Sequence, residues 1–354
     1  MTKKFWSSRI RDLVPYTPGE QPKDRKFIKL NTNENPYPPS PRVLDAIHTS
    51  ADTSLRLYPD PECSVLRRAL AEEYRLNENQ IFVGNGSDEV LAFAFQAFFG
   101  VGDTIAFPDI TYSFYPVYAN IFGIRCKTVP LNPDFTVPVE ALLGGNQGVV
   151  LANPNAPTGV ELPQSELRRI LEGNPDVVII VDEAYVDFGG TSAVSLLKEY
   201  PNLLVVQTMS KSRSLAGMRI GFAFGSENLI QAINCVKNSI NSYTLDRLAI
   251  VAGTAAVEDR AYFLESCGKV IATREWVTEQ LRNLGFTVLP SKSNFVFASH
   301  SQVPARTLFE NLRREGILVR YFAQPRIDRF LRISIGTQEE METFVAVIGR
   351  LVAA

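Results

Sequence analysis

The sequence predicts an α/β protein in which a large, mostly parallel sheet covered by helices is joined to a smaller α+β domain and an N-terminal arm. From about residue 81, short β-rich runs alternate with helical patterns, which is typical of a parallel sheet with helices on both faces. Several of these runs are apolar without alternation, as expected for strands that are buried on both faces. After about residue 285, short strands and helices replace this pattern.

The chain divides into three parts in this interpretation. Residues 1–40 form an arm and linker, because they are rich in proline and asparagine, too irregular for a regular element and too aromatic for a disordered tail. Residues 41–250 form the large domain and residues 251–354 the small one. A length of 354 residues makes two domains the natural expectation.

The expected elements follow in order along the chain. The strands of the large domain are Ile81–Gly84, Thr104–Phe107, Arg125–Val129, Gly148–Ala152, Val177–Val181, Leu203–Thr208 and Arg219–Phe224. Helical patterns follow Ser87, Tyr112, Ser165 and Ser226, and two long ones run from Leu245 to Leu284. In the small domain we expect strands at Phe286–Leu289, Asn294–Ala298, Leu318–Arg320 and Leu331–Ile335, with helices at Val303–Arg314 and Gln338–Leu351. The sequence Thr337-Gln-Glu-Glu, a capping-box pattern, opens the last helix.

Charge and composition exclude several classes of function. Lys and Arg number 36 against 38 Asp and Glu, so nothing favours a nucleic-acid or anionic-membrane partner. The apolar runs are too short to span a membrane and the first residues lack a signal core, so we expect a cytoplasmic protein. Four scattered cysteines and two histidines leave little material for a metal site or a serine triad, and we expect neither.

The first candidate site follows an apolar strand. In Val177-Val-Ile-Ile-Val-Asp182-Glu-Ala-Tyr185, a carboxylate and a tyrosine come just after five apolar residues. In open α/β sheets the ligand crevice lies at the carboxyl ends of the strands, so this pattern indicates an acid at the floor of a pocket. The alternative is an aspartate that only caps the next turn.

The second candidate follows the strand Leu203–Thr208. Ser210 and Lys211 follow it after one residue, Met209, and Arg219 stands eight residues beyond the lysine, so an amine nucleophile lies beside an anion site. Desolvation and cationic neighbours lower the pKa of a lysine, and the neutral amine can form a Schiff base with an aldehyde. Lys211 could instead be a surface lysine, but the nearby glycines, which allow close backbone approach, favour the functional interpretation.

The third candidate is a glycine-containing turn, Gly84-Asn-Gly86-Ser87-Asp88-Glu89, that ends a strand and opens a helix. Free backbone N–H groups at such a helix start can hold a phosphate. The turn lacks the third glycine of a dinucleotide-binding fingerprint, and the sequence G-x-x-x-x-G-K-[ST] is absent from the chain. Alone, this turn is a weak signal.

Together the three candidates resemble fold-type I pyridoxal-phosphate enzymes, and the whole chain resembles the histidinol-phosphate aminotransferase family. The segments that carry the resemblance are Asn31-Thr-Asn-Glu-Asn-Pro-Tyr-Pro, Leu57-Tyr58-Pro-Asp, Gly84-Asn-Gly-Ser-Asp-Glu, Asn153-Pro-Asn-Ala-Pro-Thr-Gly, Val181-Asp-Glu-Ala-Tyr, Ser210-Lys-Ser-Arg-Ser-Leu-Ala-Gly-Met-Arg and Leu331-Arg-Ile-Ser-Ile-Gly-Thr. They occur in family order over residues 31 to 337.

The resemblance implies pyridoxal 5'-phosphate as the cofactor, and three catalytic residues. Lys211 is expected to form the Schiff base and move the α-proton, Asp182 to pair with the pyridine nitrogen, and Tyr185 to bond the phenolic oxygen. The other residues expected to bind the cofactor are Ser87, Asp88, Thr208, Ser210 and Arg219 around the phosphate, Tyr112 on the ring face, and Tyr58 from the second subunit of a homodimer with shared active sites. Where the family often has asparagine, immediately before Pro-Thr-Gly, this chain has Ala156. Asn155 is the nearest substitute, or else a turn residue.

The implied reaction converts histidinol phosphate and 2-oxoglutarate to imidazole acetol phosphate and glutamate, in histidine biosynthesis. Arg320, Arg332 and Tyr16 are the expected substrate-binding residues, and salt bridges within the small domain are the alternative for the two arginines. Close alternatives are an aromatic amino acid aminotransferase or a phospho-amino-acid decarboxylase of the same fold. A non-catalytic ligand-binding protein, such as a regulator, is remote, because neither length nor charge leaves room for a DNA-binding module.

Overall fold

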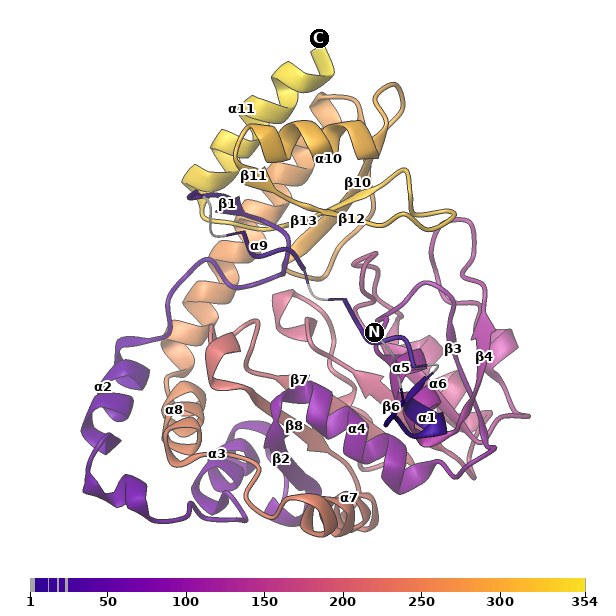
Figure 1. The fold of residues 1–354 in the computed structure, drawn as a ribbon, viewed down its shortest axis with the longest axis vertical. Helices are drawn as coiled ribbons and strands as arrows, with labels where there is room; N and C mark the ends of the chain where they lie inside the picture. Colours follow the sequence, from indigo (N-terminus) through magenta and orange to yellow (C-terminus); the bar gives the residue numbers. More distant parts are fainter. Residues whose placement is uncertain (1–3, 12, 18, 23–24, 354) are drawn as a thin grey trace.

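The computed structural model describes residues 4–11, 13–17, 19–22 and 25–353. Figure 1 shows two parts arranged along the long axis of the molecule, each built around a sheet. The seven-stranded sheet and its helices lie at the bottom of the view, and the four-stranded sheet lies at the top with helices α10 (Ala305–Arg314) and α11 (Gln338–Ala353).

The large sheet confirms the predicted mostly parallel architecture. Its strand order is β2-β8-β7-β6-β5-β3-β4. The strands are β2 (Ile81–Asn85), β3 (Thr104–Pro108), β4 (Arg125–Val129), β5 (Gly148–Ala152), β6 (Val178–Asp182), β7 (Leu203–Thr208) and β8 (Ile220–Phe224). Only β8 runs against its neighbours, β2 and β7, and all other pairs are parallel. Each expected strand is present, with its ends within one residue of the prediction.

The large sheet separates two hydrophobic cores. All six residues of β7 are buried, with Leu203 and Val205 in one core and Leu204 and Val206 in the other. Successive side chains of a strand point to opposite faces, so both faces of the sheet are covered. This is the physical reason why the strand sequences are apolar without alternation.

Helices cover each face of the large sheet. One core takes side chains from α2 (Pro41–Ser50), α3 (Ser64–Tyr74), α6 (Gln164–Glu172) and α8 (Arg247–Glu258), and the other from α4 (Gly86–Phe98), α5 (Tyr115–Phe122) and α7 (Glu227–Ile240). Short 3₁₀ helices lie in the connections: η1 (Thr53–Arg56), η2 (Glu78–Gln80), η3 (Val139–Leu142), η4 (Val186–Phe188), η5 (Ala193–Leu196) and η6 (Ala216–Met218). The carboxyl ends of the central parallel strands stay uncovered by these helices and face the other part of the molecule.

The smaller sheet is antiparallel, with the order β12-β13-β10-β9. Its strands are β9 (Phe286–Val288), β10 (Phe295–His300), β12 (Arg320–Tyr321) and β13 (Leu331–Ser334). The long helix α9 (Arg260–Asn283) packs on β9, β10 and α11. The predicted capping box of α11 is confirmed, because Thr337 N donates to Glu340 Oε2 at 2.9 Å and Glu340 N donates to Thr337 Oγ1 at 3.3 Å.

The arm departs from the prediction. It contains a short helix, α1 (Ser8–Arg11), and a strand, β1 (Ile28–Lys29), where the sequence suggested no regular element. Strand β1 pairs in parallel with β11 (Ile317–Leu318), so the expected strand Leu318–Arg320 is divided between β11 and β12. The division has a tertiary cause, since β11 pairs with the arm and β12 with the small sheet. The boundaries of the three parts at residues 40 and 250 stay a proposal.

Candidate active site

A cavity of about 180 Å³ lies at the carboxyl ends of β6 and β7, and residues of both sheets and of the arm line it. It brings together these residues that the sequence singled out: Tyr16, Ser87, Asp88, Tyr112, Asp182, Tyr185, Thr208, Ser210, Lys211, Arg219, Arg320 and Arg332. Within the described part of the chain, no cluster of three His, Cys, Asp or Glu side chains is placed to ligate a metal. None of the helices described there combines the length and apolarity needed to cross a bilayer.

Asp182 is the last residue of β6, and its side chain is a buried acid at the cavity wall. It is 5% exposed, and its Oδ2 accepts a hydrogen bond from the hydroxyl of Tyr115 at 3.0 Å. Its Oδ1 accepts one from the backbone N–H of Ala184 at 3.3 Å. Burial raises the pKa of Asp182 to about 6, although both hydrogen bonds act to lower it. A cationic group in the cavity would therefore be stabilised by this carboxylate.

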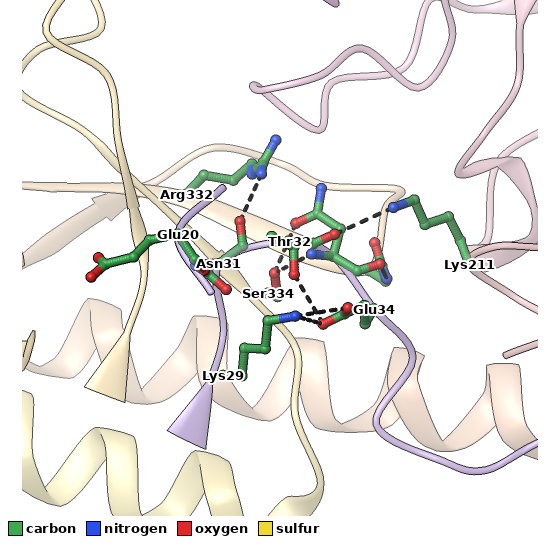
Figure 2. A network of polar contacts seen from close by, with 10 residues as sticks. Glu20, Lys29, Asn31, Thr32, Glu34, Lys211, Arg332 and Ser334 are labelled. Carbon is green, nitrogen blue, oxygen red and sulfur yellow. Dashed lines mark hydrogen bonds and ion pairs between the residues drawn. The ribbon is translucent and has the colours of Figure 1, made fainter. Parts of the chain in front are cut away.

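Lys211 follows β7 in a loop and reaches the arm. Its Nζ donates to the carbonyl oxygen of Thr32 at 3.3 Å and lies 5.9 Å from the centre of the Tyr185 ring. Figure 2 shows the Lys211 amine directed at the arm segment around Thr32, with Arg332 on the other side of that segment. The amine thus lies at the cavity wall, and the described residues hold it by one long hydrogen bond that a ligand can replace.

The turn between β2 and α4 has the shape of an anion cradle. Helix α4 is 13 residues long and begins at Gly86, whose φ is +79°. The side chain of the N-cap residue Asn85 accepts no hydrogen bond from the first turn, and Glu89 Oε2 accepts one from the Asn85 N–H at 2.6 Å, so among the described residues no side chain caps the N–H groups of Gly86, Ser87 and Asp88. A Cβ on Gly221 of β8 would lie 2.3 Å from the backbone nitrogen of Ser87, so glycine is required for this approach. Uncapped N–H groups and the helix dipole at this end favour a phosphate or another anion.

A positive charge and two hydroxyls lie around the same helix start. Arg219 Nη2 contacts Asp88 Oδ2 at 3.2 Å, and Asp88 Oδ1 accepts a hydrogen bond from the Tyr112 hydroxyl at 2.9 Å. The hydroxyls of Thr208 and Ser210 lie 3.0 Å apart and line the cavity. A guanidinium, hydroxyls and helix N–H groups together form a donor set that suits a phosphate.

Two arginines of the small sheet line the opposite side. Arg332 Nη2 donates to the carbonyl of Asn31 at 3.0 Å, and its buried Nε has no hydrogen-bond partner among the described residues. Burial lowers the pKa of Arg332. Among the described residues, Arg320 Nη2 makes one hydrogen bond, to the carbonyl of Thr17 at 3.5 Å, and the guanidinium lies 5.6 Å from the centre of the Phe322 ring. Neither forms an ion pair with a carboxylate in the described ranges, so the salt-bridge alternative does not apply and both can receive an anionic ligand.

The structure adds two polar residues that sequence reasoning missed. Asn33 Nδ2 donates to the Tyr185 hydroxyl at 3.0 Å, and Tyr115 donates to Asp182. Asn33 lies in the arm segment quoted for the family resemblance, so its residue type and place were a usable signal. Tyr115 carried no signal, because its contact with Asp182 is made only by the tertiary fold.

Two residues of the predicted site do not line the cavity. Tyr58 is 79% exposed and stacks on Tyr243 with 4.6 Å between ring centres. Asn155 is buried, and its Nδ2 donates to the carbonyl of Ile110 and the hydroxyl of Thr158. The contact with Ile110 ties this loop to the segment after β3, while the buried Oδ1 of Asn155 has no hydrogen-bond partner among the described residues.

Comparisons with known proteins agree with this geometry. The family described as Aminotransferase class I and II matches residues 25–348. The chain is similar to the histidinol-phosphate aminotransferase of Clostridium acetobutylicum, with 56% identity over 350 residues that cover 99% of each chain. It is also similar to the histidinol-phosphate aminotransferase of Acinetobacter baumannii strain SDF, with 55% identity over 341 residues, 95% of this chain and 94% of the other.

The fold is also that of a solved enzyme with its cofactor. The structure superposes with a TM-score of 0.86 on the histidinol-phosphate aminotransferase from Sinorhizobium meliloti in complex with pyridoxal-5'-phosphate. That match has 27% sequence identity and covers 93% of this chain and 92% of the other. The fold-type I architecture and the family resemblance predicted from the sequence are confirmed. The chain is an aminotransferase and belongs to the aminotransferase class I and II family.

Proposed function

We propose that this enzyme uses pyridoxal 5'-phosphate to transfer the amino group of histidinol phosphate to 2-oxoglutarate, which gives imidazole acetol phosphate and glutamate in histidine biosynthesis. The observation that carries the proposal is a single cavity that holds a lysine amine, a buried carboxylate, an anion cradle and two arginines that have no carboxylate partner among the described residues. The name shared by relatives that are 53–56% identical over nearly the whole chain supports the same substrate.

The residues at the cavity fit this cofactor. The uncapped start of α4 and the guanidinium of Arg219 suit its phosphate, Asp182 suits its ring nitrogen, and Lys211 suits its aldehyde. When bound, the cofactor supplies an aldehyde carbon that takes up an amino group and a ring that withdraws electrons from the α-carbon of the substrate.

Each catalytic side chain has a physical task in this proposal. Lys211 would hold the cofactor through its Nζ, and the same amine would carry the proton of the substrate α-carbon. Asp182 keeps the ring nitrogen protonated, because its own buried charge is costly without a cation beside it. Tyr185 would donate to the phenolic oxygen, and Tyr112 would stack on the ring.

The arginines suit the substrate. Histidinol phosphate has a phosphate and no α-carboxylate, so Arg320 and Arg332 are free to bind that phosphate. Tyr16 stacks on Phe114 at 4.5 Å and lies 6.4 Å from Tyr112, so the arm borders the same space. Each charge-assisted hydrogen bond to an anion is worth about 1.5–3 kcal/mol. Glutamate can use the same arginines through its carboxylates, and one cavity then serves both half-reactions.

We also propose a cytoplasmic homodimer with shared active sites. Leu55, Leu57, Tyr58 and Tyr243 expose large apolar side chains that a second subunit could cover. Tyr58 of such a dimer would reach the phosphate of the partner's cofactor, which explains why it stands outside the cavity of its own chain.

The test is a panel of half-reactions on the purified, cofactor-loaded enzyme. Histidinol phosphate, phenylalanine, tyrosine, glutamate and threonine phosphate are added separately while the visible absorbance of the cofactor is followed. We expect histidinol phosphate and glutamate to react with the highest kcat/KM. Faster reaction of phenylalanine or tyrosine would favour an aromatic aminotransferase, and carbon dioxide released from threonine phosphate would favour a decarboxylase. Equal activity on histidinol and histidinol phosphate would remove the phosphate role of the arginines.

A further inference from the structure

The hydroxyl of Tyr185 has a hydrogen-bond arrangement that determines where its proton points. Asn33 Nδ2 donates to Tyr185 Oη at 3.0 Å, so the tyrosine oxygen is an acceptor in this contact. The ring packs edge-on against Phe295, with 5.1 Å between centres and planes at 88°, which holds the hydroxyl in place. The Tyr185 O–H meets no acceptor in the part of the chain that the structure describes, and Tyr185 lines the cavity.

Ser334 determines which end of the Asn33 side-chain amide faces Tyr185. The backbone N–H of Asn33 donates to Ser334 Oγ at 2.9 Å, and the Ser334 hydroxyl donates to Asn33 Oδ1 at 2.8 Å. Turning the Asn33 amide over would leave the proton of the buried Ser334 hydroxyl without an acceptor, at a cost of about 1–3 kcal/mol. Ser334 therefore presents the NH₂ group of Asn33, and not its oxygen, to Tyr185.

Asn33 is itself held firmly in the arm. Its φ is +56°, a left-handed conformation that asparagine adopts more readily than most residues. Its carbonyl accepts a hydrogen bond from Asn294 Nδ2 at 2.9 Å. The preceding residue, Thr32, receives the hydrogen bond of Lys211, so the same arm segment contacts the lysine and the tyrosine.

The position where the family often has an asparagine adds a reason for this arrangement. Ala156 occupies that position, is buried and lines the cavity, but its methyl group can neither donate nor accept a hydrogen bond. Asn155, next to it, does not line the cavity, and its Nδ2 donates to the carbonyl of Ile110 and the hydroxyl of Thr158. On this wall, the described residues offer Tyr185 as the donor for the phenolic oxygen, so the direction of its proton matters.

We propose that Asn33 is a positioning residue for Tyr185: held by Ser334, it donates to the tyrosine oxygen and so directs the Tyr185 proton into the cavity, toward the phenolic oxygen of the cofactor. The inference rests on the proposed function. In this proposal Asn33 of the arm and Ser334 of β13 influence the protonation state of the cofactor, although Ser334 does not line the cavity.

The test is a pH titration of the visible absorbance of bound pyridoxal phosphate in five variants, one of them a double variant. Donation by Tyr185 stabilises the deprotonated chromophore, so Asn33→Ala and Ser334→Ala should both raise the midpoint of the titration, by roughly 0.5–1 pH unit, or threefold to tenfold in proton affinity. Tyr185→Phe should raise it at least as much, and Asn33→Ala added to Tyr185→Phe should cause no further change. Asn294→Ala is the matched control, because it loosens Asn33 through the backbone alone and should move the midpoint much less.

The outcomes separate this inference from the proposed function. A wild-type protein that develops no titrating visible band would overturn the function, and the inference with it. A wild-type band with unchanged midpoints in Asn33→Ala and Ser334→Ala would overturn the inference alone. So would an equal shift in Asn294→Ala, because it would indicate general loosening. Thermal unfolding of the cofactor-free variants identifies any that fail to fold, and Asn33→Ala and Ser334→Ala each suffice to decide.

Discussion

The buried carboxylate of Asp182 should make the cofactor-free protein less stable as the pH rises. Its pKa is about 6 in the folded protein against an ordinary value of 3.8, because burial disfavours the charged form. The folded state therefore holds this proton more tightly than the unfolded state does. The stabilisation from the protonated group is fully present below about pH 4 and is lost as the pH rises through about 6.

The size of the effect follows from the same two values. A rise from 3.8 to about 6 is about two pH units, and each corresponds to about 1.4 kcal/mol, so ionised Asp182 costs about 3 kcal/mol above pH 7. Asp182→Asn cannot ionise, and its amide oxygen can still accept the hydrogen bond from Tyr115. The wild type loses this free energy as the pH rises, and the variant does not. The unfolding free energy of the variant minus that of the wild type should therefore increase by about 3 kcal/mol from about pH 4 to pH 8.

Urea unfolding of the cofactor-free proteins at several pH values measures this difference. The neighbouring Glu183 does not line the cavity, and burial raises its pKa to about 7, so it adds a pH dependence of the same sign that cancels in the comparison. Glu183→Gln is the matched control. The unfolding free energy of this variant minus that of the wild type should keep increasing until the pH passes about 7, the pKa of Glu183. A difference between Asp182→Asn and the wild type that stays constant from pH 4 to pH 8 would refute the reasoning.

Three further predictions concern turnover. Borohydride reduction and peptide mass mapping should place the cofactor on Lys211, and a tag on another lysine would contradict this assignment. The turnover of Lys211→Ala should fall by several orders of magnitude, because the variant lacks both the nucleophile and the proton carrier. Arg320→Ala should lower kcat/KM about tenfold or more for histidinol phosphate and less for an unphosphorylated aromatic amino acid. Arg332→Ala should lower the rates of both half-reactions. Equal losses of kcat/KM on the two amines in Arg320→Ala would contradict the assignment of Arg320 to the phosphate. Mixing Lys211→Ala with Tyr58→Phe under conditions of subunit exchange should restore part of the activity, and a crystal structure with Tyr58 in the cavity of its own subunit would contradict shared sites.

The sequence alone determined the large sheet and most of the candidate site. Strand periodicity and burial are local properties, and each strand of the large sheet lies within one residue of its predicted ends. Because the carboxyl ends of parallel strands meet at one edge, Asp182 after one strand and Lys211 after the next could be placed in one cavity from sequence. The turn at Ser87 also comes just past an apolar strand, which predicts it at the same edge, and the reversed strand β8 explains how its helix start reaches that edge.

Only the tertiary structure decided the remaining contacts. The pairing of β1 with β11 divided an expected strand, and the hydrogen bond from Asn33 to Tyr185 joins residues 152 positions apart. Whether Arg332 has a carboxylate partner, and which way the Asn33 amide points, depend on neighbours brought together from distant parts of the chain. The physical reason is that a periodic pattern reports which face of an element is buried, while a hydrogen bond depends on distance and angle to one specific atom, and packing alone sets these.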